Sequence, residues 1–220
     1  MSSPSSPARG RPARIDRERT VRTALDLLDR SGLDALTMRR LADAMDVQAG
    51  ALYRYFATKQ DLLAAMAERM MDGVVDAAAG TCGGDWSERL TALARAMRAA
   101  LLSRRDGARV FAGTHSTGAN MLGFADTVVG VMRAAGFPDD DAARALYTLA
   151  NFTVGHTLEE QAALQGENDG PADPGLLADA VAGGTYAHLA AGLPALTSTD
   201  FTRLFEFGLN LIVEGLRARR

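Results

Sequence analysis

Apolar residues recur with helical spacing along almost the whole chain. In the N-terminal part, Val21, Ala24, Leu25 and Leu28 repeat at i, i+3, i+4 and i+7, which is the stripe of an amphipathic helix. The same pattern, interrupted at clusters of Gly, Pro and Asp, predicts helices over about residues 16–31, 37–45, 47–57, 58–79, 90–101, 121–132, 139–164, 176–189 and 200–217. We therefore expect an all-α fold.

Residues that cap helices support several of these boundaries. Gly32 follows the first helix as a stop, and Thr37 offers an N-cap for the second. Thr58, with Asp61 three residues later, has the spacing of a capping box and opens the longer fourth helix. The three helices before it form a candidate helix-turn-helix unit.

The last predicted helix is apolar on nearly all sides. Its apolar positions are Phe201, Leu204, Phe205, Phe207, Leu209, Leu211, Ile212, Val213 and Leu216. Such a helix must be covered from more than one direction. We expect a second copy of the chain to supply part of that cover in a two-fold homodimer, with the 139–164 helix in the interface and Gly155 allowing close approach. The competing interpretation is a monomeric bundle with this helix at its centre.

Composition excludes several classes of protein. The chain has 220 residues, 47% apolar and 23% charged, with a net charge of −3, which is ordinary for a globular protein. Cys82 is the sole cysteine, so neither an intrachain disulfide nor a cysteine zinc cage can form. The sequence has no apolar run of about 18 residues and no secretory signal. We therefore expect no membrane contact and a cytoplasmic location.

Positive charge is concentrated at the start of the chain. Residues 1–14 are rich in Ser, Pro and Arg and are expected to form a disordered basic arm. From residue 9 to residue 22, six arginines are opposed by only Asp16 and Glu18. This arm suggests contact with a polyanion such as DNA, although a solvated tail would have the same composition.

The third helix combines a buried side with unusual outward residues. Leu52 and Phe56 suit the packing against the first two helices, whereas Tyr53 and Tyr55 are left outside. A longer helix followed by two short ones is the arrangement of a helix-turn-helix module, whose last helix enters the major groove of DNA. Three-helix packing without DNA binding is the alternative.

Each outward residue has an expected role on DNA. Gln48 would hydrogen-bond a base edge, Ala49 and Gly50 would allow close approach, and Arg39 would reach a guanine. Phosphate contacts are expected from Tyr53, Tyr55, Lys59 and the helix start at Thr37. Arg40 and Arg54 have weaker claims, because each is equally well explained as a solvated arginine.

The segment from Leu36 to Met66 reads LTMRRLADAMDVQAGALYRYFATKQDLLAAM and resembles the DNA-binding domain of the TetR family of bacterial repressors. It departs from the family at Asp46, where glycine is usual. Aspartate tolerates the left-handed conformation better than most residues, so we expect the turn to survive. The resemblance implies a DNA-binding domain over residues 15–61 and a ligand-binding and dimerisation domain over residues 62–220.

Three later segments resemble the C-terminal domain of the tetracycline repressors. They are ALLSRRDGARVFAGTHST (100–117), AAGFPDDDAARALYTLANFTVGHTLEEQ (134–161) and FEFGLNLIVEGL (205–216). The resemblance implies a homodimer formed by the 139–164 and 200–217 helices. It also implies a small-molecule site at Val75, Leu93, Met97, Phe111, Thr114, His115, Phe124, Thr127, Val128, Leu146 and Glu159.

The resemblance also indicates that the ligand differs from magnesium-tetracycline. Phe111 stands where the tetracycline repressors carry a histidine that holds the magnesium ion, and phenylalanine offers no ligand atom. Val75, Leu93 and Met97 make the site drier, so we expect an apolar organic ligand with Thr114, His115, Thr127 and Glu159 as polar anchors. Core packing alone would also explain the apolar positions.

These observations predict a ligand-responsive repressor that binds a palindromic operator as a homodimer. Two alternatives stay open: a small-molecule-binding helical protein without DNA binding, and a repressor that responds to magnesium-tetracycline. No catalytic motif or cofactor motif is visible, so we expect neither enzyme activity nor a cofactor. His156 and Glu159 are close to one helical turn apart, but no third metal ligand accompanies them.

Overall fold

The computed structural model describes residues 16–80, 84–114, 116–165 and 174–219. All regular structure in these residues is helical, as expected. The helices are α1 (Arg17–Ala35), α2 (Met38–Ala44), α3 (Ala49–Leu52), α4 (Lys59–Met70), α5 (Val74–Ala79), α6 (Trp86–Leu102), α7 (Gly107–Phe111), α8 (Ala119–Ala134), α9 (Asp139–Gln165), α10 (Pro174–Ala182), α11 (Ala187–Leu196) and α12 (Phe201–Arg217).

The first helix begins and kinks where its sequence indicates. The side chain of Asp16 caps α1 by accepting the Arg19 amide at 2.7 Å. The helix continues to Ala35 instead of ending near residue 31, but Gly32 within it has φ +76°. A Cβ on this glycine would lie 3.1 Å from a carboxylate oxygen of Asp106. Glycine at this position therefore allows both the left-handed backbone conformation and the close approach of the α6–α7 turn.

The caps and the turn of the N-terminal unit are confirmed. Thr37 caps α2 by accepting the Arg40 amide at 3.2 Å, and Asp46 adopts φ +55° in the turn before α3. Thr58 and Asp61 form both hydrogen bonds of the capping box that starts α4. Since these hydrogen bonds join residues three apart, local sequence is enough to predict them.

The prediction of one helix from residue 58 to residue 79 is wrong. α4 ends at Met70, Gly73 adopts φ +74°, and α5 starts at Val74. The apolar pattern hides this break, because Met70 before it and Val74 after it are both buried in the same core. The domain boundary expected at residues 61/62 falls inside α4, which packs on α1 as well as on α7 and α8.

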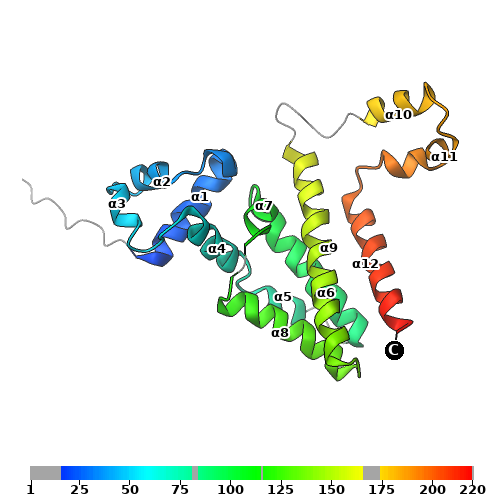
Figure 1. Cartoon of the computed structure of the whole chain (residues 1–220), viewed down its shortest axis with the longest axis horizontal. Helices are drawn as coiled ribbons and strands as arrows, with labels where there is room; N and C mark the ends of the chain where they lie inside the picture. The colour runs from blue at the N-terminus through cyan, green and yellow to red at the C-terminus, as the bar shows by residue number, and fades with distance from the viewer. Residues whose placement is uncertain (1–15, 81–83, 115, 166–173, 220) are drawn as a thin grey trace, which may run out of the picture.

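The larger C-terminal part is built around α6 and α9. α6 packs against α5, α7, α8 and α9, and α9 also packs against α8 and α12. Figure 1 shows α1–α3 at one side of the molecule and this bundle at the other, with α4 between them. One apolar cluster runs through both parts, from Leu28 in α1 to Leu209 in α12.

The predicted single helix over residues 176–189 is also wrong. The chain forms α10 and α11 with a turn at Gly183 and Gly184, where a Cβ on Gly184 would lie 2.4 Å from the Tyr186 ring. The two helices contact one another and project beyond the ends of α9 and α12 (Figure 1). Their larger apolar side chains, such as Leu176 and Tyr186, are 62% and 56% exposed.

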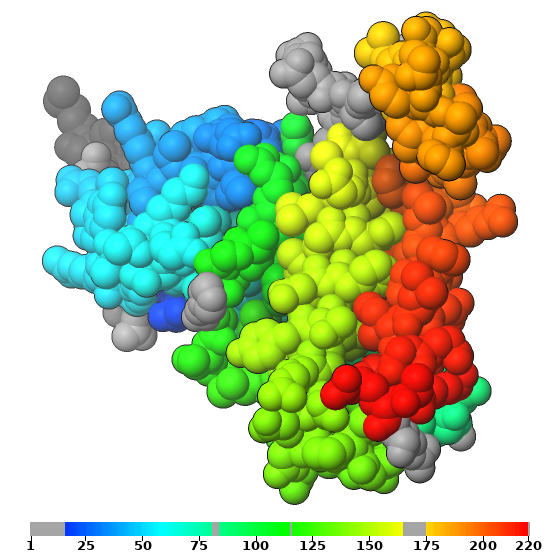
Figure 2. Space-filling view, turned by 45° about the vertical axis from the view of Figure 1, so that its right-hand side comes forward, coloured from blue at the N-terminus to red at the C-terminus, as the bar shows by residue number. Residues whose placement is uncertain are grey.

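α12 is covered on one side only. Phe205, Leu209 and Val213 are buried against the bundle, whereas Phe207 and Leu211 are 65% and 59% exposed. Figure 2 shows α12 beside α9 on one face of the molecule. Phe207 and Leu211 are among the residues that we expect a second copy of the chain to cover.

A buried ion pair joins α6 to α9. Arg98 donates to both carboxylate oxygens of Glu160, at 2.8 and 2.6 Å, and the two side chains are only 14% and 8% exposed. The Arg98 guanidinium also lies 5.1 Å from the ring centroid of Phe205 and donates to Thr202 at 3.2 Å. Arg98 thus connects α6 with both α9 and α12.

His156 lies beside this ion pair and is held neutral. Its Nε2 is 2.9 Å from the carbonyl oxygen of Phe201 and 4.0 Å from the Glu160 carboxylate. Burial lowers the pKa of His156, against the opposing effects of the Phe201 hydrogen bond and the Glu160 charge, and Arg98 lowers it further. We therefore assign Nε2 as the N–H donor to Phe201 rather than as a cation paired with Glu160.

The lowered pKa predicts a loss of stability in mild acid. The unfolded chain regains the ordinary histidine pKa of about 6.5 and binds a proton more readily than the folded chain. The contribution of His156 to the free energy of unfolding is therefore complete above about pH 6.5 and decreases as the pH drops below that value. Glutamine at this position keeps an N–H donor but does not titrate. Urea unfolding at about pH 7.5 and about pH 5.5 should show a smaller acid loss for His156→Gln than for the wild type. Equal losses in both proteins would contradict the assignment.

Candidate DNA-binding surface and ligand cavity

α3 and the turn that follows it are anchored by two buried side chains and present two aromatic side chains outward. Leu52 and Phe56 are fully buried, and the guanidinium of Arg17 covers the Phe56 ring at 4.9 Å from its centroid. Tyr53 and Tyr55 are 52% and 40% exposed. The predicted division between packed and outward residues is therefore confirmed, but the predicted helix over residues 47–57 is wrong: α3 ends at Leu52, and Tyr53, Tyr55 and Phe56 lie in the turn that follows it.

The other residues predicted to contact DNA lie at the ends of the short helices. Gln48 is the N-cap residue of α3, with an exposed side chain that makes no capping hydrogen bond. A Cβ on Gly50 would meet no atom within 4 Å, and Ala49 beside it is half-buried. The turn before α3 and its first residues therefore form an open, small-residue surface suited to close approach.

The remaining predicted residues flank this surface at the starts of α2 and α4. Thr37 and Arg39 are exposed at the first turn of α2, and Lys59 is exposed as the first residue of α4. Arg40 differs from its neighbour, because its guanidinium donates to the carbonyl oxygen of Ala35 at 3.1 Å. That contact gives Arg40 a structural role, while its side chain is exposed to solvent as expected from the sequence.

Polar contacts tie the end of α1 to the turn before α7. The Asp106 carboxylate, only 6% exposed, accepts the Leu33 amide at 2.7 Å. Arg109 pairs with Asp34 at 2.9 Å, and this hydrogen bond and charge lower the pKa of Asp34, with a smaller effect from the positive charge of Lys59. The helix-turn-helix unit is therefore fixed to the bundle through charged groups as well as through apolar packing.

A cavity of about 290 Å³ lies where α5, α6 and α8 meet. Three residues predicted to bind ligand line it, one from each helix: Val75, Leu93 and Thr127. Its other lining residues are Ala78, Ala79, Arg89 and Val131. Thr127 donates its hydroxyl to the Gly123 carbonyl at 2.7 Å, so its oxygen remains able to accept. The volume is at the low end of ligand sites, which begin at about 300 Å³.

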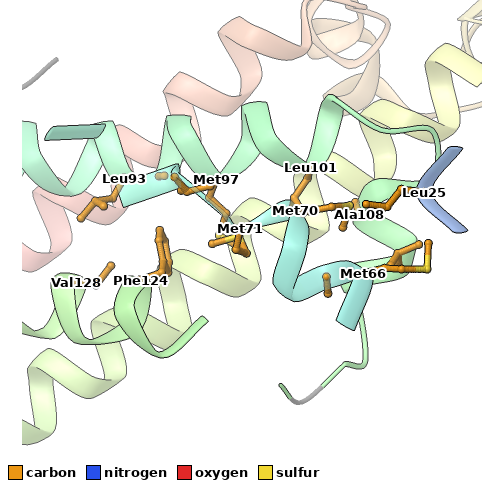
Figure 3. Packing of buried hydrophobic residues seen from close by; sticks show 14 of the residues in the cluster. Leu25, Met66, Met70, Met71, Leu93, Met97, Leu101, Ala108, Phe124 and Val128 are labelled. Carbon is orange, nitrogen blue, oxygen red and sulfur yellow. The ribbon is translucent and has the colours of Figure 1, made fainter. Parts of the chain in front are cut away.

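Three more predicted ligand residues are buried beside this cavity. Met97 of α6 and Phe124 and Val128 of α8 belong to the same apolar cluster as Leu93. Figure 3 shows the side chains of Leu93 and Met97 above those of Phe124 and Val128. The tertiary structure thus brings together most of the apolar positions that the resemblance indicated.

The remaining predicted residues lie at other places in the fold. Phe111 is half-buried at the end of α7, and Thr114 donates its hydroxyl to the Phe111 carbonyl at 2.7 Å. Leu146 is half-buried against the core, whereas Glu159 is exposed on α9 and does not line the 290 Å³ cavity. His115 lies outside the described residues.

Sequence reasoning missed Arg89 as a cavity residue. Arg89 is four residues before Leu93 on α6 and therefore shares its helical side, which is a signal that the sequence contains. Within the described part of the chain, no group of three or more His, Cys, Asp or Glu side chains could hold a metal ion. None of the helices in that part is both long and apolar enough to cross a bilayer.

Comparisons with known proteins agree with this architecture. Residues 21–66 match the family described as "Bacterial regulatory proteins, tetR family", and residues 80–220 match "Tetracyclin repressor-like, C-terminal domain". The first match covers most of the helix-turn-helix unit and the start of α4, and the second covers the bundle from α6 to α12; residues 67–79, which include α5, lie between them.

Three relatives extend over nearly the whole chain. A possible TetR family transcriptional regulator from Streptomyces coelicolor A3(2) is 73% identical, with a TM-score of 0.86 over 93% of this chain and 100% of that one. The class A tetracycline repressor protein of Escherichia coli is 40% identical over 91% of this chain and 89% of its own length. BioQ, solved with its double-stranded DNA operator, is 30% identical, with a TM-score of 0.67 over 93% and 99% of the two chains.

Both family matches and these identities confirm the resemblance stated from the sequence. The relatives include transcriptional repressors and a protein bound to operator DNA, and the helix-turn-helix unit and helical bundle have the arrangement predicted for such a protein. The chain therefore belongs to the TetR family of bacterial transcriptional regulators, which bind DNA and respond to small ligands.

Proposed function

We propose that this protein is a repressor that binds a palindromic operator as a homodimer and is released by a small, largely apolar organic molecule. The observation that carries the DNA-binding half is the segment of α3 and the turn after it, which Leu52 and Phe56 anchor and from which Tyr53 and Tyr55 point outward. A dimer would place two such helices about 34 Å apart, one turn of DNA, and therefore on a two-fold symmetric site. As a regulator of bacterial DNA, the protein would act in the cytoplasm.

The proposed dimer interface is the exposed apolar face of α9 and α12. Tyr147 of α9 is 69% exposed, and Phe207 and Leu211 of α12 are exposed to a similar degree. Large apolar side chains exposed on two neighbouring helices are of the kind that marks an interaction site. Gly155 has no atom within 4 Å of a Cβ built on it, so the middle of α9 is open to a partner helix.

The proposed ligand class follows from the residues of the cavity. Val75, Leu93 and Val131 supply alkyl surface, whereas Thr127 and Arg89 supply polar groups. Pockets of this kind bind mainly through apolar contact, and a few polar groups orient the ligand. Phe111 offers no atom to a magnesium ion, which favours an apolar ligand over magnesium-tetracycline.

The proposed mechanism is thermodynamic linkage between the two sites. α4 packs on α1 of the helix-turn-helix unit and on α7 and α8 of the bundle, so a ligand that displaces the bundle helices also changes the placement of α3. If ligand weakens DNA binding by a given factor, DNA weakens ligand binding by the same factor.

The DNA-binding half is tested by selecting duplexes from a random-sequence pool with the purified protein and measuring their affinity at several salt concentrations. Lys59→Ala should weaken binding to every duplex and reduce the slope of log K against log salt by about 0.9, because one phosphate contact is lost. Gln48→Ala should instead relax preference at one base position, by about 1–3 kcal/mol. Failure to select any palindrome, or unchanged binding by both variants, would refute this half.

The ligand half is tested by screening compounds for release of the selected duplex. We expect release by apolar organic compounds without added metal. Leu93→Trp should reduce that response by filling the cavity, while leaving binding of the duplex intact. Release by tetracycline only in the presence of magnesium would support the alternative reading and refute the apolar ligand class.

A further inference from the structure

One carboxylate of α4 serves as the N-terminal cap of α8. Glu68 accepts the backbone amides of Asn120 at 2.6 Å and of Met121 at 3.2 Å. The backbone carbonyl oxygen of Glu68 also accepts a hydrogen bond from the side-chain amide of Asn120 at 3.1 Å. These backbone amides are in the first turn of α8, where an N-cap side chain of the same helix would usually accept them.

α8 has no N-cap side chain of its own. Its N-cap residue is Gly118, for which no side-chain capping bond exists. A Cβ on Gly118 would lie 2.2–2.6 Å from the carboxylate atoms of Glu68, so any other residue would displace that carboxylate. Gly118 has φ −70° and ψ 161°, which any residue adopts. Space for Glu68, rather than backbone conformation, therefore explains the glycine.

The two helices joined in this way belong to the two candidate sites. α4 buries Leu62 and Met66 in the cluster that also holds Leu25 of α1, and it follows α3 directly. α8 carries Thr127 and Val131 of the ligand cavity, about two to three turns beyond the cap. The start of α8 beside the end of α4 is visible in Figure 1.

We propose that Glu68 is the positioning residue that makes α4 and α8 move together, so that displacement of the cavity wall reaches the DNA-binding helices. The inference rests on the proposed function, because it assumes that DNA and ligand sites are linked. Apolar packing between α4 and α8 can slide, whereas three hydrogen bonds to one residue fix both the distance and the direction of the first turn of α8. The positive end of the α8 dipole strengthens the hold on the carboxylate.

Two variants separate this role from simple capping. Glu68→Ala removes the cap and the link together. Glu68→Ala combined with Gly118→Asp supplies a cap from within α8, since aspartate is a good N-cap residue and the space of the Glu68 carboxylate is then free. The control is Arg69→Ala, the neighbouring position, whose guanidinium pairs with Asp72.

The readout is hydrogen exchange of the amides of residues 119–124, with and without a duplex selected by the wild type and used at a concentration that saturates each variant. In the wild type and in Arg69→Ala, we expect the duplex to change this exchange. In Glu68→Ala, exchange without DNA should be about fivefold to tenfold faster, because the first turn of α8 has lost its cap. The change in exchange on adding the duplex should disappear. In the double variant, slow exchange should return but the response should not.

Each other outcome overturns the inference in an identifiable way. If Glu68→Ala still responds to the duplex, or if the double variant regains the response, Glu68 is not the link. If α8 of the wild type does not respond to bound duplex, the coupling through α8 is refuted while DNA binding stands. If the wild type binds no duplex at all, the proposed function fails, and this inference fails with it.

Discussion

Replacing both Phe207 and Leu211 by aspartate is expected to convert the protein to a monomer and to abolish its operator binding. The two side chains are 65% and 59% exposed on α12 in the single chain, and in the proposed dimer they are buried. Four carboxylates facing each other across a two-fold interface would cost about 4 kcal/mol or more, which raises the dimer dissociation constant about a thousandfold. A monomer has one recognition helix and cannot span both halves of a palindrome.

The measurement is sedimentation equilibrium, combined with binding of the selected duplex. Leu122→Asp is the matched control, because Leu122 is 54% exposed on α8 and lies outside the α9–α12 face. It should leave both the dimer and the affinity for the duplex unchanged. A double variant that still sediments as a dimer would refute the proposed interface, and a monomeric wild type would refute the dimer itself.

Replacing Glu160 by alanine is expected to cause the second large loss, this time in stability. The Arg98 side chain is only 14% exposed in the native structure. The substitution leaves its guanidinium without the bidentate partner. Breaking a buried ion pair in this way costs about 3–5 kcal/mol, or about 10 °C in melting temperature for a chain of this size. Thermal unfolding at a fixed protein concentration measures the effect, since a dimer melts in a concentration-dependent way.

A second ion pair, which joins α6 to α12, provides the control. Arg95 donates to both carboxylate oxygens of Glu206 at 2.7 Å, with the side chains 53% and 32% exposed. Because solvent screens this pair, Glu206→Ala should cost at most about 1 kcal/mol. Replacing Arg98 by methionine and Glu160 by leucine together should restore most of the stability, since no buried charge is then left unpaired. Equal losses for Glu160→Ala and Glu206→Ala would contradict this account.

Much of the N-terminal unit could be predicted from residues near each other in the chain. The caps at Thr37 and Thr58 and the turn at Asp46 depend on hydrogen bonds or backbone preferences within a few positions, so a single sequence contains all the information needed. The outward position of Tyr53 and Tyr55 likewise follows from the burial of Leu52 and Phe56 in the same short segment, although α3 itself ends at Leu52. The placement of cavity residues on three helices came from the family resemblance and not from local pattern.

The sequence alone therefore determined the all-α class, the helix-turn-helix unit and the apolar stripes, because helical periodicity and capping are local. The tertiary structure decided which acidic residue is buried: Glu159 is exposed, whereas the adjacent Glu160 pairs with Arg98, 62 positions away. It also decided the break at Gly73, where both flanking helices bury the same core, and the capping of α8 by Glu68, 52 positions before Asn120. These features depend on residues that only the folded chain brings together, and no spacing along the sequence records such contacts.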